Sequence, residues 1–400
     1  MSLMRKKLFL CLIIIIPFVA FSQAYKKLHF NAVVVDTHND IPTTAIDKGL
    51  SFDQDLTGKT HSDLKRMIAG GVDVQIFSIW CDGNMQNPYA WANREIDTVM
   101  AWTNRNPDKM MTAFSSEKIN TAVKEKKLAV LFGLEGGHMI ENDLGKLEAL
   151  YKRGVRYMTL TWNNSTDWAT SAADENPQNS SLETVINETA RKPGLTGFGR
   201  SVIKKMNELG MMVDLSHVGE HTFWDAINTT TKPVIVSHSC AHALCPHRRN
   251  LKDEQIKAVG KNGGVIHLNF YSGFVDSAYE KRSDAFLAKH KQEMDSLLKI
   301  NPEPYFMNVY LFEKYPDEVQ MMRPPLSLLI DHIDHIVKLI GVDHVGLGSD
   351  FDGINSSPQQ LDDVTNMPLV TKELLKRGYS KTDVRKILGG NFLRLFAANE

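Results

Sequence analysis

The sequence contains few cysteines and has almost no net charge. Its four cysteines are Cys11, Cys81, Cys240 and Cys245, and the first of these lies in an apolar N-terminal stretch. Loss of that stretch would leave three, which cannot form a complete disulfide framework, so the core must be held by packing alone. The net charge is −1, from 46 basic and 47 acidic residues, which gives no support for binding nucleic acid or an anionic membrane.

Long apolar runs are also absent beyond the N-terminus. Three basic residues at positions 5–7 precede the apolar residues 8–21, and small residues suitable for cleavage follow at 20–24. This order predicts a secretory signal peptide over residues 1–24 and an exported chain over 25–400, with a retained N-terminal anchor as the alternative. Residues 395–400 offer no hydrophobic tail for a glycolipid anchor, so we expect no stable membrane insertion after cleavage.

A recurrent pattern joins an amphipathic helical segment, a glycine and a short apolar run. It occurs, for example, at Gly154, Gly210 and Gly341. Glycine suits the left-handed position that ends a helix, and the apolar run suits a strand buried on both faces. With other apolar runs, the pattern predicts eight strands, at residues 33–36, 72–77, 128–134, 155–160, 211–215, 233–237, 265–268 and 345–348.

Helical segments alternate with these strands, among them residues 199–209, 220–228, 253–259 and 326–340. Eight alternations indicate an α/β fold of the (β/α)₈ (TIM) barrel type rather than an open sheet. The seventh connection is long, and we predict an insertion before the eighth strand, over about 277–325, helical near 285–300 and loop-like near 301–304. Two C-terminal helices are expected after the last strand, at 367–377 and 381–396.

Potential metal ligands follow several of these strands. His38 and Asp40 stand two residues apart after the first strand, so that in extended backbone both side chains point to the same side and can bind one cation. Barrel enzymes place their active sites at the C-terminal ends of the strands. The residues at the corresponding ends of other strands are Glu135, His217, His238 and Asp350.

Each of these residues alone has a purely structural explanation. His217 and His238 could be hydrogen-bonded core histidines, and Glu135 could accept a bond at a helix N-terminus. Their joint placement favours metal. Carboxylates with imidazoles suit Zn²⁺, or alternatively Mn²⁺ or Co²⁺, and five ligands suffice for two ions that share a carboxylate. Such a pair would generate a bridging hydroxide able to attack a peptide carbonyl, while Asp350 passes a proton to the leaving amine.

Six segments, in the same order along the chain, resemble the membrane (renal-type) dipeptidases. They are residues 36–40, 135–138, 214–217, 237–239 with 248–250, 348–353 and 389–394. This family comprises zinc-dependent (β/α)₈ hydrolases of dipeptides, which tolerate a D-residue on the C-terminal side.

The resemblance implies a role for each matched residue. His38 and Asp40 hold one zinc, His217 and His238 hold the second, and Glu135 bridges the two and takes part in catalysis. Asp350 matches the acid/base carboxylate. Arg249 matches the arginine that takes the free carboxylate of the substrate, although a surface arginine in a basic turn is the alternative reading.

The chain departs from the family after the fourth strand. Well-known members place a histidine after Thr-Leu-Thr, where this chain has Trp162 and Asn163. We predict that Trp162 forms an apolar wall of the substrate site. Asn163 could supply a replacement hydrogen-bond donor to the substrate, although a plain loop asparagine is the favoured reading. The disulfides of the animal enzymes also lack counterparts, which fits a bacterial periplasmic or secreted enzyme better than an animal surface protein.

Two other classes of function remain open. One is a related barrel amidohydrolase acting on N-acyl amino acids, lactones or phosphoesters. Such barrels often bridge their metals with a carboxylated lysine, which the end of the fourth strand lacks, so Glu135 favours a dipeptidase that cleaves L-X-L or L-X-D substrates. The other is a binding protein that has lost turnover, which retention of both ligand pairs and Asp350 disfavours. The sequence leaves the preferred side chains and the oligomeric state open, a homodimer included.

Overall fold

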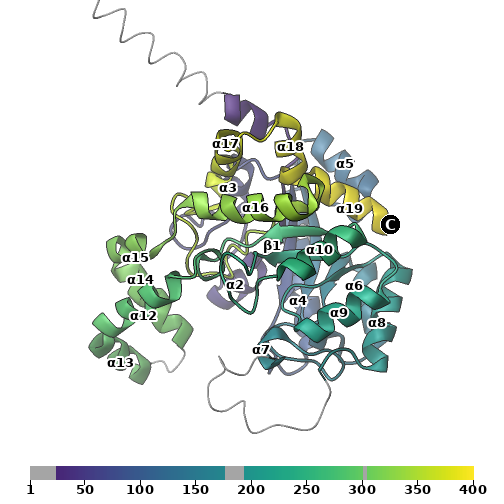
Figure 1. Cartoon of the computed structure of the whole chain (residues 1–400), viewed down its shortest axis with the longest axis horizontal. Coiled ribbons are helices and arrows are strands. Elements are labelled where there is room, and N and C mark those ends of the chain that lie inside the picture. The colour runs from purple at the N-terminus through teal and green to yellow at the C-terminus, as the bar shows by residue number, and fades with distance from the viewer. Residues whose placement is uncertain (1–23, 176–192, 301–303) are drawn as a thin grey trace, which may run out of the picture.

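Eight parallel strands form a nearly closed barrel in the computed structural model, which describes residues 24–175, 193–300 and 304–400 (Figure 1). Each strand pairs with the next along the path. They are β1 (Val35–Asn39), β2 (Val74–Trp80), β4 (Leu128–Glu135), β5 (Val155–Thr159), β6 (Met212–Asp214), β7 (Ile235–Ser239), β8 (Val265–Leu268) and β9 (Val345–Leu347). These strands correspond to the eight predicted from the sequence, so the predicted barrel is confirmed.

The barrel closes between its first and last strands. A parallel bridge joins Asn39 to Phe351. Next to it, the backbone N–H of Asp350 donates to the carbonyl of His38 at 3.0 Å, and the N–H of Asp40 donates to the carbonyl of Phe351 at 2.9 Å. Closure therefore brings the residues that follow β1 beside those that follow β9.

A ninth strand, β3 (Met110–Thr112), pairs with β4 outside this path. The sequence analysis missed it because three residues are too short to show an alternating pattern.

Helices cover the barrel, as the alternation predicts (Figure 1). The four predicted helical segments are found as α8 (Gly197–Leu209), α9 (Glu220–Thr229), α10 (Asp253–Asn262) and α16 (Leu326–Ile340). Glycines in the left-handed region end α8 and α10, at Gly210 (φ +82°) and Gly263 (φ +83°). The surrounding helices of eight or more residues are α2 (Ile41–Lys48), α4 (Pro88–Arg105), α5 (Ser116–Lys124), α6 (Leu144–Lys152), α8 (Gly197–Leu209), α9 (Glu220–Thr229), α10 (Asp253–Asn262) and α16 (Leu326–Ile340).

The long connection between β8 and β9 forms a helical lobe that projects from the barrel (Figure 1). Its helices are α12 (Tyr279–Lys289), α13 (Lys291–Ile300), α14 (Pro304–Lys314) and α15 (Pro316–Met322). The lobe has its own apolar cluster, which includes Phe286, Leu311 and Met322. Helix is more extensive than predicted: α14 already starts at Pro304, and most of the predicted loop near 301–304 lies outside the described residues.

The chain ends in α17 (Pro368–Lys376), α18 (Lys381–Arg385) and α19 (Asn391–Asn399). The helix predicted over 381–396 is interrupted by a π-helical turn, Lys386–Gly390. Close packing explains the glycine there, because a Cβ on Gly389 would lie 2.4 Å from the carbonyl oxygen of Val33, just before β1.

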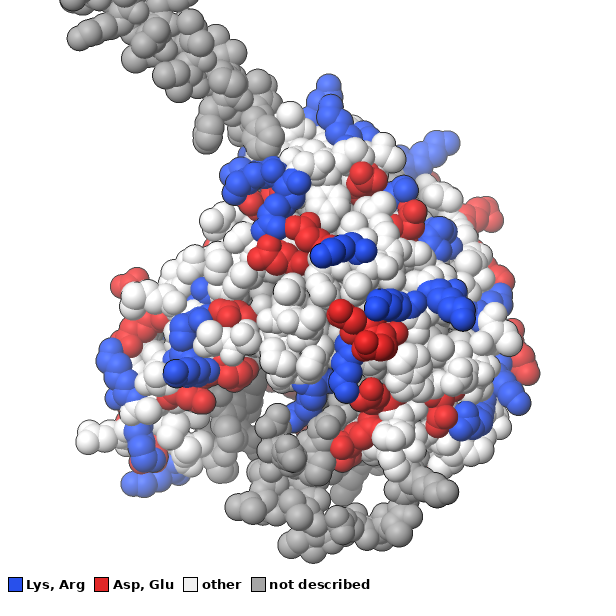
Figure 2. All heavy atoms as spheres, in the orientation of Figure 1, with Lys and Arg blue, Asp and Glu red and all other residues white. Residues whose placement is uncertain are grey.

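Four further observations bear on the sequence predictions. Cys81, Cys240 and Cys245 are buried and free, so no disulfide occurs in the described part of the chain. No helix within the described ranges is long and apolar enough to cross a membrane. The predicted signal peptide lies outside the described residues apart from residue 24. Basic and acidic side chains are interspersed over the face seen in Figure 2.

Candidate metal centre

Six predicted site residues meet at the C-terminal end of the barrel. The structure brings together the ends of β1, β4, β6, β7 and β9, and the side chains of these residues approach one another to within hydrogen-bond or ligand distances. The six are His38, Asp40, Glu135, His217, His238 and Asp350.

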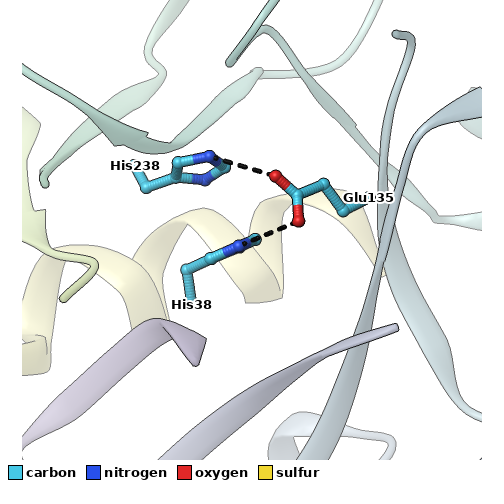
Figure 3. A group of neighbouring side chains, drawn as sticks. All are labelled: His38, Glu135 and His238. Atoms are coloured by element: carbon cyan, nitrogen blue, oxygen red, sulfur yellow. Dashed lines mark ion pairs between the residues drawn. The ribbon is translucent and has the colours of Figure 1, made fainter. Parts of the chain in front are cut away.

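Glu135 stands between two groups of ligands. Its Oε2 lies 3.3 Å from Nε2 of His38, which in turn lies 3.5 Å from Oδ2 of Asp40. Its Oε1 lies 2.9 Å from Nε2 of His217 and 3.4 Å from Nε2 of His238. Figure 3 shows His38 and His238 reaching opposite oxygens of the carboxylate. Each oxygen therefore faces one of the two predicted ligand pairs.

A buried tyrosine orients His38. The hydroxyl of Tyr157, on β5, donates to the carbonyl of Thr37 at 2.9 Å, so its oxygen accepts from Nδ1–H of His38 at 2.8 Å. Nε2 of His38 therefore faces Glu135 and is the nitrogen available to a metal. Gly133 makes the arrangement fit, because a Cβ there would lie 2.0 Å from Cζ of Tyr157.

The other two histidines are oriented in the same way. Ser237 donates its hydroxyl to Oδ2 of Asp214 at 2.6 Å, so its oxygen accepts from Nδ1–H of His238 at 2.8 Å. Nδ1 of His217 lies 3.2 Å from the amide oxygen of Asn163, which can only accept. In all three histidines, Nε2 is the nitrogen left free to bind a metal.

Asn163 therefore contacts a predicted ligand, His217, through its amide oxygen. The sequence analysis considered a donor role toward the substrate for this residue, and this role stays a prediction. Its side-chain oxygen contacts His217, and its backbone carbonyl accepts from the hydroxyl of Ser171 at 2.8 Å.

The free nitrogens need positive charge near them. Nε2 of His217 and Nε2 of His238 lie only 3.0 Å apart, and Nε2 of His38 is buried without a hydrogen-bond partner. Burial together with the charge of Arg249 lowers the pKa of His217 to about 3, and burial lowers that of His238 well below its usual range. At His38, burial is outweighed by the charges of nearby groups, among them Glu135 and Asp40, and the pKa lies well above its usual range. The cluster therefore favours positive charge beside His38 but disfavours protons on His217 and His238, and divalent cations fit this set of oxygen and nitrogen donors.

Two buried aspartates form a supporting layer that the sequence analysis did not single out. Asp214 accepts from Thr159 and Ser237, both at 2.6 Å, and so ties β5, β6 and β7 together. Asp36 accepts from the backbone N–H (2.8 Å) and the hydroxyl (2.7 Å) of Ser349, which ties β1 to the segment after β9. Burial raises the pKa of Asp36 to about 6. Both aspartates are the first residues of segments that carry the family resemblance, and this position could have identified them from the sequence.

The backbone adopts an uncommon conformation at two of the six residues. His217 and Asp350 have φ values of 64° and 61°, in the left-handed region that residues other than glycine seldom occupy. Such strain is often found at functional sites. Oδ2 of Asp350 accepts from Asn269 at 2.7 Å, and burial with the nearby Asp40 carboxylate raises the pKa of Asp350 well above its usual range.

Arg249 lines a pocket of about 280 Å³ together with His217. It is only 6% exposed, and its Nη2 donates to the carbonyl of His238 at 3.2 Å, while its Nε has no hydrogen-bond partner. The alternative reading of Arg249 as a surface arginine is wrong. Burial lowers its pKa to about 10, which leaves it charged at neutral pH.

Trp162 is half-buried beside the ligands. Its ring packs edge to face on Trp80, at the end of β2, with centroids 5.0 Å apart, and its centroid lies 6.4 Å from that of His217. The two indoles thus form an apolar surface next to the metal centre.

Comparisons with known proteins identify relatives of this chain. Residues 22–400 match the model of the membrane dipeptidase family, peptidase family M19. An uncharacterized dipeptidase of Schizosaccharomyces pombe is 32% identical over 401 residues, covering 94% of this chain and 83% of its own.

Solved structures with the same fold include two bacterial peptidases. The probable dipeptidase PvdM of Pseudomonas aeruginosa has a TM-score of 0.75 at 23% identity, over 95% of this chain and 98% of its own. A metallopeptidase of Rhodobacter sphaeroides, liganded with a phosphinate mimic of the dipeptide L-Ala-D-Ala, has a TM-score of 0.73 at 21% identity, over 92% and 100%. The family match over nearly the whole chain shows that this protein belongs to the membrane dipeptidase family of metallopeptidases.

Proposed function

We propose that the protein is a dinuclear zinc dipeptidase that hydrolyses L-X-L and L-X-D dipeptides. The observation that carries the proposal is the position of Glu135, whose two oxygens face separate ligand groups. A carboxylate placed in this way can bridge two cations. The ligand of the Rhodobacter sphaeroides peptidase, a mimic of L-Ala-D-Ala, supports a D-residue on the C-terminal side.

His38 and Asp40 would hold one ion, His217 and His238 the other, and Glu135 both. When bound, two Zn²⁺ ions supply a nucleophilic hydroxide at neutral pH and polarise the peptide carbonyl. The hydrogen bonds from Nδ1 to Tyr157, Asn163 and Ser237 hold the imidazoles in the required tautomer.

Asp350 is the candidate for moving the proton. It lies beside His38 and Asp40, and Asn269 holds one of its two oxygens by a hydrogen bond. The other oxygen can take a proton during attack on the carbonyl and deliver it to the leaving amine.

Arg249 is the candidate for recognising the free carboxylate of the dipeptide. Its buried guanidinium lines the same pocket as His217, so a carboxylate bound there lies close to the metal centre. A charged anchor at a short, fixed distance restricts the enzyme to substrates with one residue after the cleaved bond. On the acyl side, the indoles of Trp162 and Trp80 offer an apolar wall.

A substrate panel tests the proposal. The protein, stripped of metal and reloaded with Zn²⁺, Mn²⁺ or Co²⁺, should hydrolyse dipeptides much faster than N-acyl amino acids, lactones or phosphoesters. Faster hydrolysis of any of these other classes would overturn the dipeptidase proposal in favour of a related amidohydrolase. Metal analysis of protein purified without chelators should find zinc, which would identify it as the native metal.

We also infer that residues 1–24 direct export of the chain and are then removed. The basic, apolar and small-residue regions of that segment support the inference. Expression of the full chain in a Gram-negative bacterium, followed by fractionation and N-terminal sequencing, should yield periplasmic protein that begins near residue 25.

A further inference from the structure

The pocket beside the metal centre contains more positive charge than one carboxylate would neutralise. Its charged and titratable lining residues are His217, Glu220, His242, Arg248, Arg249 and Lys252. One acidic residue, Glu220, is among them. It forms an ion pair with Lys252, whose Nζ lies 2.7 Å from its Oε2, so these two charges cancel.

Arg248 and Arg249 form no ion pair within the described residues, and the carboxylates of Asp350 and Glu135 act on Arg249 only from a longer distance. Within residues 24–175, 193–300 and 304–400, no carboxylate oxygen lies within 4.0 Å of either guanidinium. Nε of each arginine is buried and has no hydrogen-bond partner. Elsewhere in the barrel a buried arginine does find partners: Arg66 donates to Asp63 at 2.6 Å and to Asp363 at 3.1 Å.

Unsatisfied buried donors on a cation are costly, and native proteins keep them mainly where a ligand completes the site. Two neighbouring guanidinium groups in one pocket match two anionic groups in one ligand. The α-carboxylate assigned to Arg249 accounts for one of them.

We propose that Arg248 binds a second carboxylate, in the side chain of the C-terminal residue of the substrate. The preferred substrates are then dipeptides ending in aspartate or glutamate. This inference rests on the proposed dipeptidase function and specifies its substrate class. The Glu220–Lys252 pair at the same pocket adds no net charge, so the selectivity depends on Arg248.

Matched substrates isolate the side-chain charge. We compare kcat/KM for Ala-Asp with Ala-Asn, and for Ala-Glu with Ala-Gln, each with the C-terminal residue in the L and the D form. For the wild-type enzyme, kcat/KM should be higher for the acidic member of each pair by about tenfold or more. The difference should lie mainly in KM, because the charged hydrogen bond forms in the ground state and the transition state alike.

Two variants test the residue. Arg248→Gln should abolish the preference, because it lowers kcat/KM for Ala-Asp by about tenfold more than it lowers kcat/KM for Ala-Asn. Arg248→Glu should reverse it, so that Ala-Lys becomes a better substrate than Ala-Asp. Lys257→Gln, which removes an exposed positive charge from α10 outside the pocket, serves as the control and should keep the wild-type preference.

Several outcomes would overturn the inference. Equal kcat/KM for Ala-Asp and Ala-Asn in the wild type would show that no acidic side chain is recognised. An equal loss on both substrates in Arg248→Gln would show that both arginines bind the single α-carboxylate. Hydrolysis of Ala-Ala with no acidic preference refutes this inference alone, whereas hydrolysis of no dipeptide refutes the proposed function with it.

Discussion

Tyr157 accepts a hydrogen bond from His38 across the inside of the barrel, with its oxygen 2.8 Å from Nδ1. The tyrosine comes from β5 and the histidine from β1, so the contact links two strands that are not neighbours in the sheet. It fixes which nitrogen of His38 faces Glu135.

Replacement of this hydroxyl should weaken the metal site without unfolding the barrel. Tyr157→Phe keeps the ring that packs against Gly133 but leaves Nδ1 of His38 and the carbonyl of Thr37 without their partner. We expect metal affinity to fall about 10- to 100-fold and stability to fall by about 1–3 kcal/mol. Chelator competition measures the affinity, and thermal melting of the metal-free protein measures the stability. Tyr151→Phe, at a tyrosine on α6 away from the site, is the control; equal effects from both would refute the role.

Asn163 should matter through His217. Asn163→Leu removes the acceptor for Nδ1–H and should reduce bound metal, whereas Asn163→Asp keeps an acceptor and should retain it. Metal content after dialysis against a weak chelator gives the answer. If Asn163→Leu instead raised KM with full metal content, the residue would contact the substrate, as the sequence analysis first suggested.

Glu135 should be required for both ions. The wild-type protein is expected to hold about two equivalents of metal, and Glu135→Ala fewer than one, because each ion loses a shared ligand and faces the other unscreened. Elemental analysis of gently purified protein supplies the count. One equivalent, unchanged by Glu135→Ala, would mean a mononuclear centre.

Arg249 should distinguish free dipeptides from their amides. Arg249→Ala removes a charged hydrogen bond in a shielded pocket, worth roughly 2–4 kcal/mol, so KM for a free dipeptide should rise sharply. Hydrolysis of the corresponding dipeptide amide should change little. Equal losses on both would show that the bond from Arg249 to the carbonyl of His238 is its only role.

Trp162 should set the preference for the acyl-side residue. Trp162→His replaces part of the indole wall with a smaller polar ring. The variant should gain kcat/KM on Gly-X substrates and lose it on Leu-X and Phe-X substrates. A uniform change across all of them would indicate that Trp162 only packs against Trp80.

The sequence was most informative about the ends of the strands. Hydrophobic patterning located the strands, and a parallel barrel places their C-terminal ends together, so His38, Glu135 and His238 could be grouped before any coordinates were known. The residues that orient these side chains could not be predicted in the same way. The contact of Tyr157 with His38 crosses the barrel interior and depends on the space left by Gly133. No local pattern encodes such a contact.

The extra helices of the insertion were missed for a different reason. Helices α14 and α15 contribute to the small apolar cluster of the lobe. Their boundaries follow from contacts inside the lobe, which the strand–helix alternation of the barrel does not predict.

The seam between β1 and β9 has a consequence for the order in which the protein matures. Asp36 and Ser349, which join the two sides of this seam, are 313 residues apart in the chain. During synthesis, the first ligand pair leaves the ribosome long before the strand that must lie beside it. The nascent chain therefore cannot offer a finished metal centre, and ions captured earlier would meet only a partial set of donors. In the proposed dinuclear centre, metal loading would therefore follow closure of the barrel.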